Sequence, residues 1–278
     1  MKIYHLPKGI LIKEQESYYL NTQQSWDELV NQDNLYTRIK EQLPELEKVE
    51  NPDAYLSKKI LAPIGSQEVW GSGVTYYRSR DARMEEAKDA GGGDFYDRVY
   101  DAERPELFFK ATHYRVVGTN DYVRIRKDSS WDVPEPEMTL FISSSGQIQG
   151  YTLGNDMSSR SIEGENPLYL PQAKSYTGST AIGPCLYLAE QALPKSTEIK
   201  LQIKRAGETV FSGETSIDQI KREFTELVDF LFRECDFPQG VYLMTGTGII
   251  PSHDFTLQSG DEIFISAEPI GTLVNRVK

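Results

Sequence analysis

Short runs of β-branched and aromatic residues, separated by glycine and proline, dominate this chain from Val69 to its end. Such runs are typical of short strands joined by turns. We expect strands at 107–110, 137–142, 150–153, 186–188, 199–205, 240–244 and 262–265. The sequence therefore predicts an α+β protein whose body is mostly β.

The first 65 residues differ from this body. Residues 10–12 and 18–20 are apolar and flank a polar turn, which predicts a short hairpin. Residues 21–58 are polar and helix-prone, with prolines at positions 44 and 52 as breakers. Because the texture changes near residues 63–65, we expect a small N-terminal α+β domain over 1–65 and a catalytic domain over 66–278.

One amphipathic helix is expected after Ser216, which can cap it, with Gln219 three residues later completing a capping box. Apolar residues between Ile217 and Phe232 then recur on one stripe at helical spacing, so this helix should pack on a sheet. A second helix is expected at about 81–88, followed by three glycines at 91–93.

Charge and cysteine content restrict the partners and the compartment. Acidic residues outnumber basic residues by 42 to 30, which gives a formal net charge of −12 at pH 7. Binding to nucleic acid or to an anionic membrane needs the opposite sign, so we expect neither partner.

No apolar run approaches the roughly 20 residues of a membrane span, and the N-terminus shows no secretory signal. Cys185 and Cys235 lack metal-ligand spacing, so two buried thiols in a cytoplasmic protein are expected.

A set of carboxylates carries the clearest chemical signal. Glu135 and Glu137 lead into an apolar strand, and residues two apart in a strand point to the same face. A hairpin turn at 143–146 would bring a second strand, which ends at Asp156, beside the first. Three carboxylates without cysteine or histidine suit a hard cation such as Mg²⁺, Mn²⁺ or Ca²⁺.

A simpler interpretation of the same stretch remains open. Pro134 and Pro136 confine the start of this strand to an edge or a rim of a sheet. The acidic pair would then belong to a solvated edge strand, where charge opposes aggregation. The apolar run directly after Glu137 argues against it, because that run draws the pair toward the body of the protein.

Two lysines and one glycine-rich turn are further candidates. Lys110 ends an aromatic strand and is either a surface lysine or a cation in a pocket. Lys174 follows a proline in an expected loop, where it is either exposed or, if desolvated, a base. The turn at 245–248 is either an ordinary tight turn or a nest of N–H groups for a carboxylate. Arginines at 78, 80 and 83 form either an anion site or partners for glutamates on the same helix.

From about residue 68 to its end, the chain resembles the fumarylacetoacetate hydrolase family. The shared landmarks are Pro134-Glu135-Pro136-Glu137, the stretch 150–160 (Gly-Tyr-Thr-Leu-Gly-Asn-Asp-Met-Ser-Ser-Arg), Gly183-Pro184 and Thr245-Gly246-Thr247. Within the family, the stretches 104–112, 165–174 and 270–273 are similar to the branch that dehydrates 2-keto-3-deoxy sugar acids, over nearly the full length.

The resemblance implies a mixed β-sandwich roll with a small N-terminal domain, assembled as a homodimer or homotetramer. It implies a divalent ion, Mg²⁺ before Mn²⁺ or Ca²⁺, that is held by Glu135, Glu137 and Asp156. It also places Lys174 and Glu106 in the reacting pocket. Four further residues would lie near the substrate: Ser79, Arg80, Lys110 and Thr247.

One departure from the family bears on the reaction. The hydrolases resemble one another in an early motif, Gly-x-Asn-Tyr-x-x-His, whose histidine helps to activate water. Here the stretch 73–79 reads Gly-Val-Thr-Tyr-Tyr-Arg-Ser, so Ser79 stands at the position of the histidine. This difference favours a reaction that needs no activated water.

The expected activity is therefore metal-dependent dehydration of a 2-keto-3-deoxy sugar acid, a pentonate, to 2,5-dioxopentanoate. Lys174 would remove a C3 proton from this small 2-keto acid, and Glu106 would protonate the departing C4 hydroxyl. The alternative within the family is a hydrolase or decarboxylase that cleaves a carbon–carbon bond of a diketo acid. A third interpretation is a non-catalytic module whose carboxylates hold structural Ca²⁺.

Overall fold

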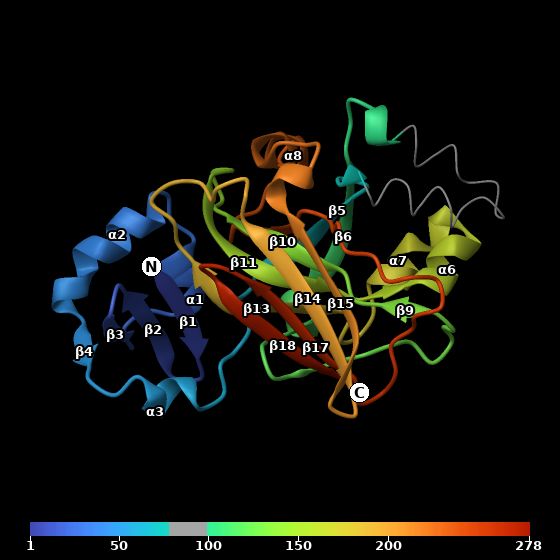
Figure 1. Ribbon diagram of the computed structural model, residues 1–278. Coiled ribbons are helices and arrows are strands. Elements are labelled where there is room, and N and C mark those ends of the chain that lie inside the picture. Colours follow the sequence, from blue (N-terminus) through green and yellow to red (C-terminus); the bar gives the residue numbers. More distant parts are fainter. Residues whose placement is uncertain (78–98) are drawn as a thin grey trace.

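Two β-sheets of different size pack face to face in the computed structural model, which describes residues 1–77 and 99–278 (Figure 1). The larger sheet has the order β4 (Glu47–Val49), β3 (Ser17–Asn21), β2 (Gly9–Glu14), β1 (Lys2–Leu6), β13 (Thr180–Tyr187), β11 (Ile148–Asp156), β10 (Pro136–Ile142), β16 (Val241–Met244), β5 (Glu68–Gly73) and β6 (Glu106–Thr112). A further strand, β7 (Val116–Val117), pairs with β13. The strands expected at 107–110, 137–142, 150–153, 186–188 and 240–244 overlap β6, β10, β11, β13 and β16, respectively.

The smaller sheet has the order β15 (Glu208–Ser216), β14 (Glu198–Arg205), β17 (Glu262–Ala267), β18 (Gly271–Val277) and β8 (Tyr122–Val123). A separate pair joins β9 (Asp132–Val133) to β12 (Ser158–Ser159). Parallel pairs occur between β16 and β5, β13 and β7, and β18 and β8, whereas the other pairs are antiparallel. The sheets are therefore mixed, as the expected fold class requires.

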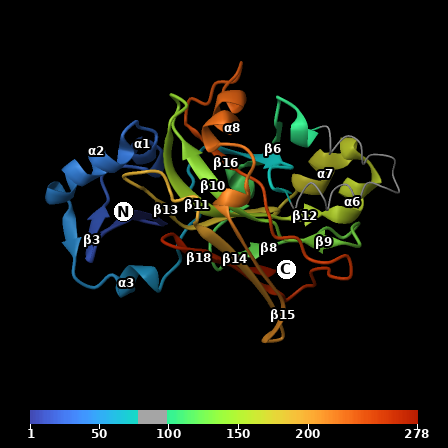
Figure 2. The ribbon, with the colours of Figure 1, turned by 45° about the horizontal axis from the view of Figure 1, so that its top comes forward.

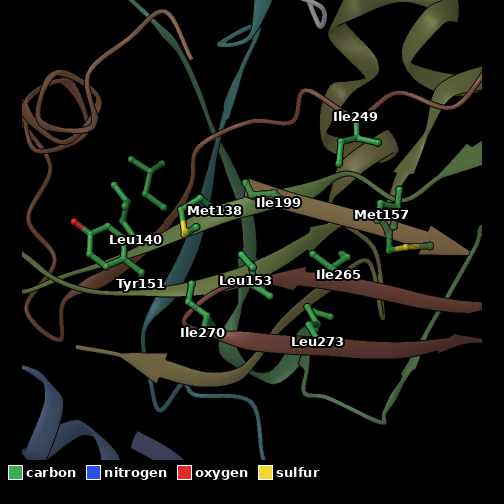
Figure 3. Close-up of a cluster of buried hydrophobic side chains, with 14 of the residues drawn as sticks. Met138, Leu140, Tyr151, Leu153, Met157, Ile199, Ile249, Ile265, Ile270 and Leu273 are labelled. Atoms are coloured by element: carbon green, nitrogen blue, oxygen red, sulfur yellow. The ribbon is translucent and has the colours of Figure 1, made fainter. Parts of the chain in front are cut away.

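The main core lies between the two sheets. Residues of β10 and β11 face residues of β14, β17 and β18, as Figure 3 shows for Met138, Leu140, Leu153, Ile199, Ile265 and Leu273. Along β14 buried and exposed residues alternate, which is typical of a sheet with one face on the core and one face toward water.

The other face of the larger sheet is covered by the N-terminal helices α1 (Trp26–Val30) and α2 (Leu35–Gln42). Their apolar side chains pack with residues of β10, β13 and β16, among them Phe141, Ile182 and Tyr242. Every residue of β10 is consequently buried. The interpretation of this strand as a solvated edge is therefore wrong: β10 lies between β11 and β16, and only its proline end extends beyond β16.

The hairpin expected in the first 20 residues is confirmed by β2 and β3, in which Ile12 pairs with Tyr19 and Leu11 with Leu20. The expected helices follow as α1 and α2, and a short third helix is α3 (Asp53–Leu56). Strand β1 pairs with β13, so the N-terminal residues continue the larger sheet of the body. The division into domains at residue 65 stays a prediction.

The helix expected after Ser216 begins later than predicted. Residues Ile217–Gln219 form a single 3₁₀ turn without a side-chain cap, and α8 spans Phe224–Leu231. Tertiary contacts explain the difference: Ile220 forms a β-bridge with Tyr76, and the backbone N–H of Lys221 donates to the carbonyl of Thr75 at 3.0 Å. The packing of α8 on the core, through Leu227, Val228 and Leu231, is as expected.

Two short helices, α6 (Arg160–Glu165) and α7 (Leu170–Lys174), lie on the opposite side of the molecule from α1 and α2 (Figures 1 and 2). Lys174 is therefore the last residue of a helix, so the prediction that it lies in a loop is wrong. Cys185 is buried, Cys235 is only half-buried, and both are free thiols. Among the described residues, no helix is both long and apolar enough to cross a membrane.

Candidate active site

Three buried carboxylates meet where β10 and β11 end. Glu137 lies opposite Gly154 in the hairpin, and the backbones of Glu135 and Asp156 exchange hydrogen bonds of 3.2 and 2.9 Å. One oxygen from each of Glu135, Glu137 and Asp156 lies within 4.8 Å of the others. The three side chains are between 1% and 4% exposed. The predicted convergence of these carboxylates is confirmed.

Three basic side chains, Lys174, Arg160 and Lys110, surround the carboxylates. Lys174 Nζ donates to Glu135 Oε2 at 2.6 Å, to Asp156 Oδ2 at 3.0 Å and to Ser158 Oγ at 2.7 Å. Arg160 Nη2 donates to Glu135 Oε1 at 2.7 Å. The interpretation of Lys174 as an exposed lysine is therefore wrong, because it is 2% exposed and bound to two of the three acids.

Lys110 also contacts the carboxylate cluster. Its ammonium lies 2.6 Å from Asp156 Oδ1 and donates to the backbone carbonyls of Met157 and Lys174. Its side chain is fully buried and does not line the adjacent pocket. Burial lowers the pKa of Lys110, and the charge of Asp156 acts in the opposite direction. The surface interpretation of Lys110 is wrong, and its expected contact with substrate stays a prediction.

Glu137 is held differently from the other two acids. The backbone N–H of Gly246 donates to Glu137 Oε2 at 2.6 Å, so the turn at 245–248 does present an N–H group to a carboxylate. Burial raises the pKa of Glu137 well above its usual value, and the charges of Asp156 and Glu135 add to this effect. A divalent ion between the three carboxylates would relieve this repulsion.

A pocket opens beside the cluster. Its walls include all three acids together with Glu106, Lys174 and Thr247. The structure thus brings Glu106 and Thr247 to the place where the resemblance put them, although their roles stay predictions. Ser79, the arginines at 78, 80 and 83, and the helix expected at about 81–88 lie outside the described residues.

Several residues that line the pocket or, like Ser158, contact Lys174 were not predicted as site residues. Phe108 lies two residues from Glu106 on β6, and its ring centroid is 5.7 Å from Lys174 Nζ. Ser158 and Arg160 follow Asp156 at intervals of two. The alternation of side chains along an extended chain is the signal that could have found them. Glu163, on α6, also lines the pocket, and no sequence pattern indicates it.

The donor set fits a hard divalent cation. Carboxylate oxygens are the ligands that Mg²⁺, Mn²⁺ and Ca²⁺ prefer, and the cluster contains no sulfur or imidazole ligand among the described residues. The buried basic side chains and the N–H of Gly246 hold the three carboxylates close to one another. This support is of the kind that orients ligands in metal sites.

Comparison with known proteins shows the protein family to which the chain belongs. A profile of the family described as Fumarylacetoacetate (FAA) hydrolase C-terminal matches residues 74–278. The chain therefore belongs to the fumarylacetoacetate hydrolase family.

Individual relatives within this family are similar to the chain over most of its length. The chain is 45% identical over 226 residues to a probable 2-keto-3-deoxyxylonate dehydratase of Haloferax volcanii, covering 81% of this chain and 77% of that protein. It is 43% identical to a 2-dehydro-3-deoxy-D-arabinonate dehydratase of Saccharolobus solfataricus, covering 79% and 74%. A solved structure of 2-keto-3-deoxy-D-arabinonate dehydratase complexed with magnesium and 2,5-dioxopentanoate aligns with a TM-score of 0.85 and 34% identity, over 100% of this chain and 99% of that one.

Proposed function

We propose that this protein is a magnesium-dependent dehydratase that converts a 2-keto-3-deoxypentonate to 2,5-dioxopentanoate. One observation carries the proposal: three buried carboxylates suited to Mg²⁺ share a pocket with Lys174 and Glu106. The full-length likeness to a dehydratase solved with magnesium and 2,5-dioxopentanoate supports the same substrate class.

Glu135, Glu137 and Asp156 would hold the ion. When bound there, Mg²⁺ supplies a Lewis acid that withdraws charge from the 2-keto group of the substrate and acidifies its C3 protons. Lys174 acts as the neutral amine and removes one of these protons through Nζ, because it lines the pocket beside the carboxylates.

Glu106 completes the elimination. It lines the pocket together with Lys174, so in its protonated form it can give its proton to the C4 hydroxyl, which leaves as water. The resulting enone isomerises to the aldehyde. Carbon is neither oxidised nor reduced overall, so the reaction needs no redox cofactor.

The histidine needed for water activation has no counterpart in the described part of this site. His5 stacks on Trp26, His113 follows β6, and His253 lies beside Trp131. None of the three lines the pocket. This favours dehydration over hydrolytic cleavage of a diketo acid.

Turnover tests the proposal directly. Purified protein with Mg²⁺ and 2-keto-3-deoxypentonate should release a semialdehyde, and an acylpyruvate in the same assay should stay intact. Lys174→Met should lower kcat by about 10²- to 10⁴-fold, the usual contribution of a general base. Lys200→Met, at an exposed lysine of the smaller sheet, is the matched control and should keep full activity. Normal turnover by Lys174→Met, or cleavage of the acylpyruvate alone, would refute the proposal.

The proposal includes a cytoplasmic location and a homodimer or homotetramer. The free thiols of Cys185 and Cys235 support a reducing compartment, because disulfides are rare there. Resemblance to the family supports the oligomer. Light scattering on the eluted protein measures the mass and would reject the oligomer if the protein is a monomer at working concentration.

A further inference from the structure

Two glycines lie on one face of β5, at the end that borders the pocket. Gly71 and Gly73 are two residues apart in the strand, so they face the same way. In the register with β6, Gly71 lies opposite Phe108 and Gly73 opposite Glu106. Neither glycine has a positive φ, so the backbone conformation alone would accept alanine at both positions.

The space above these glycines is filled by the two side chains from β6. A Cβ atom on Gly73 would lie 2.0 Å from Glu106 Oε2 and 2.5 Å from its Cδ. A Cβ atom on Gly71 would lie 2.5 Å from Phe108 Cζ. These distances are far shorter than any normal contact of a Cβ atom, so the carboxylate and the ring rest directly on bare backbone.

The backbone under these side chains is fixed on its other side. Strand β5 pairs with β16, and Ser72 Oγ donates to the carbonyl of Met244 at 2.8 Å. On its other side β16 pairs with β10, which carries Glu137. The position of the glycines relative to the carboxylate cluster is therefore set by continuous strand pairing.

We propose that Gly71 and Gly73 form a ledge without Cβ atoms on which the pocket side chains are placed, and that Gly73 is a positioning residue for Glu106. Any side chain at position 73 would push the Glu106 carboxylate away by about 1 Å, a misplacement that can cost on the order of 100-fold in rate. The inference uses the proposed function only in assigning proton donation to Glu106, since the placement itself is a matter of packing.

A four-protein cycle tests the ledge: the wild type, Gly73→Ala, Glu106→Ala and the double variant. Gly73→Ala should lower kcat about 100-fold, with KM for the sugar acid and calorimetric Mg²⁺ affinity within twofold of the wild type. It should also lower Tm, but only slightly, because the colliding atoms lie at the end of a flexible side chain. In the Glu106→Ala background the same glycine substitution should change neither kcat nor Tm, because the colliding carboxylate is gone. Gly164→Ala, whose new Cβ would meet nothing within 4 Å, is the matched control.

The two readouts separate the two proposals. If the wild type dehydrates no sugar acid, the proposed function fails, and the Tm cycle still tests the ledge. The ledge would be overturned if Gly73→Ala lowered Tm equally in the wild-type and the Glu106→Ala background. It would also be overturned if the kcat of Gly73→Ala stayed within twofold of the wild type. If Gly73→Ala does not fold, a folded double variant supports the ledge. An unfolded double variant overturns it, because the collision would then involve another group.

Discussion

The two sheets accommodate charged side chains in opposite ways. At the end of the larger sheet, Asp156 is 1% exposed and lies 2.6 Å from the fully buried ammonium of Lys110. On the smaller sheet, Glu262 and Arg276 also form an ion pair, but their side chains are 32% and 54% exposed. Water compensates the exposed charges, whereas the buried ones depend on each other and on backbone groups.

The difference in burial of the charged side chains indicates which sheet carries the candidate active site. Burial of charge is unfavourable, so a cluster of buried acids and cations beside a pocket is a stronger indication of chemistry than the total number of charges. The smaller sheet, with water on one face, contributes the opposing wall of the core. The larger sheet, covered on both faces, contributes the end of β10 and β11 where the three buried carboxylates meet.

Removal of one buried acid should have the largest effect on stability. Asp156→Ala leaves the buried ammonium of Lys110 without its carboxylate, and breaking a buried pair in this way costs about 3–5 kcal/mol. Urea unfolding in magnesium-free buffer measures the loss in the free energy of unfolding. A loss below about 1 kcal/mol, the usual range of an exposed pair, would remove the contrast between the two sheets.

Magnesium should stabilise the folded protein through the larger sheet. At a concentration 100 times its Kd, an ion that binds only the folded state adds about 2.7 kcal/mol. The expected result is a rise in Tm with Mg²⁺ that EDTA reverses and that Glu137→Gln abolishes. Glu262→Ala should keep the full rise, and a rise that survives in Glu137→Gln would place the ion elsewhere.

The next largest loss of stability is expected where residues pack tightly around the hairpin of β10 and β11. A Cβ atom on Gly154 would lie 2.4 Å from Thr139 Oγ1 and 2.9 Å from Met244 Cε, so Gly154→Ala should cost about 1–3 kcal/mol through overpacking. Ser212→Ala, on the exposed side of the smaller sheet, should change stability by less than about 0.5 kcal/mol. Thermal denaturation of both variants gives the comparison, and equal Tm values would contradict it.

The smallest effect is expected for the exposed pair itself. Glu262→Ala removes the partner of Arg276, and such surface pairs contribute about 0–1 kcal/mol. The loss should shrink further in high salt, because solvent ions screen exposed charges. A salt-independent loss of several kcal/mol would show that the smaller sheet also depends on its charges.

Local patterns in the sequence predict much of this arrangement. Alternation along two strands and one hairpin turn is sufficient to bring Glu135, Glu137 and Asp156 together, because each step depends on neighbours in the chain. The mostly β body follows in the same way from short apolar runs between turn residues.

Long-range packing decides the features that sequence patterns missed. The helix after Ser216 is shortened because Ile220 pairs with Tyr76, about 140 residues earlier in the chain. The burial of Lys110 and Lys174 depends on acids from other strands, so each lysine alone is indistinguishable from a surface residue. The bare surface under Glu106 appears only when β5 lies beside β6.

Co-crystallisation with Mg²⁺ and pyruvate tests the central claim most directly, namely that the end of β10 and β11 holds an ion that activates a 2-keto acid. We expect Mg²⁺ bound by Glu135, Glu137 and Asp156, with the carboxylate and keto oxygen of pyruvate on the ion and Lys174 Nζ facing the methyl carbon. Crystals grown in abundant magnesium that show no ion there, with Lys174 still bound to Glu135 and Asp156, would contradict the claim.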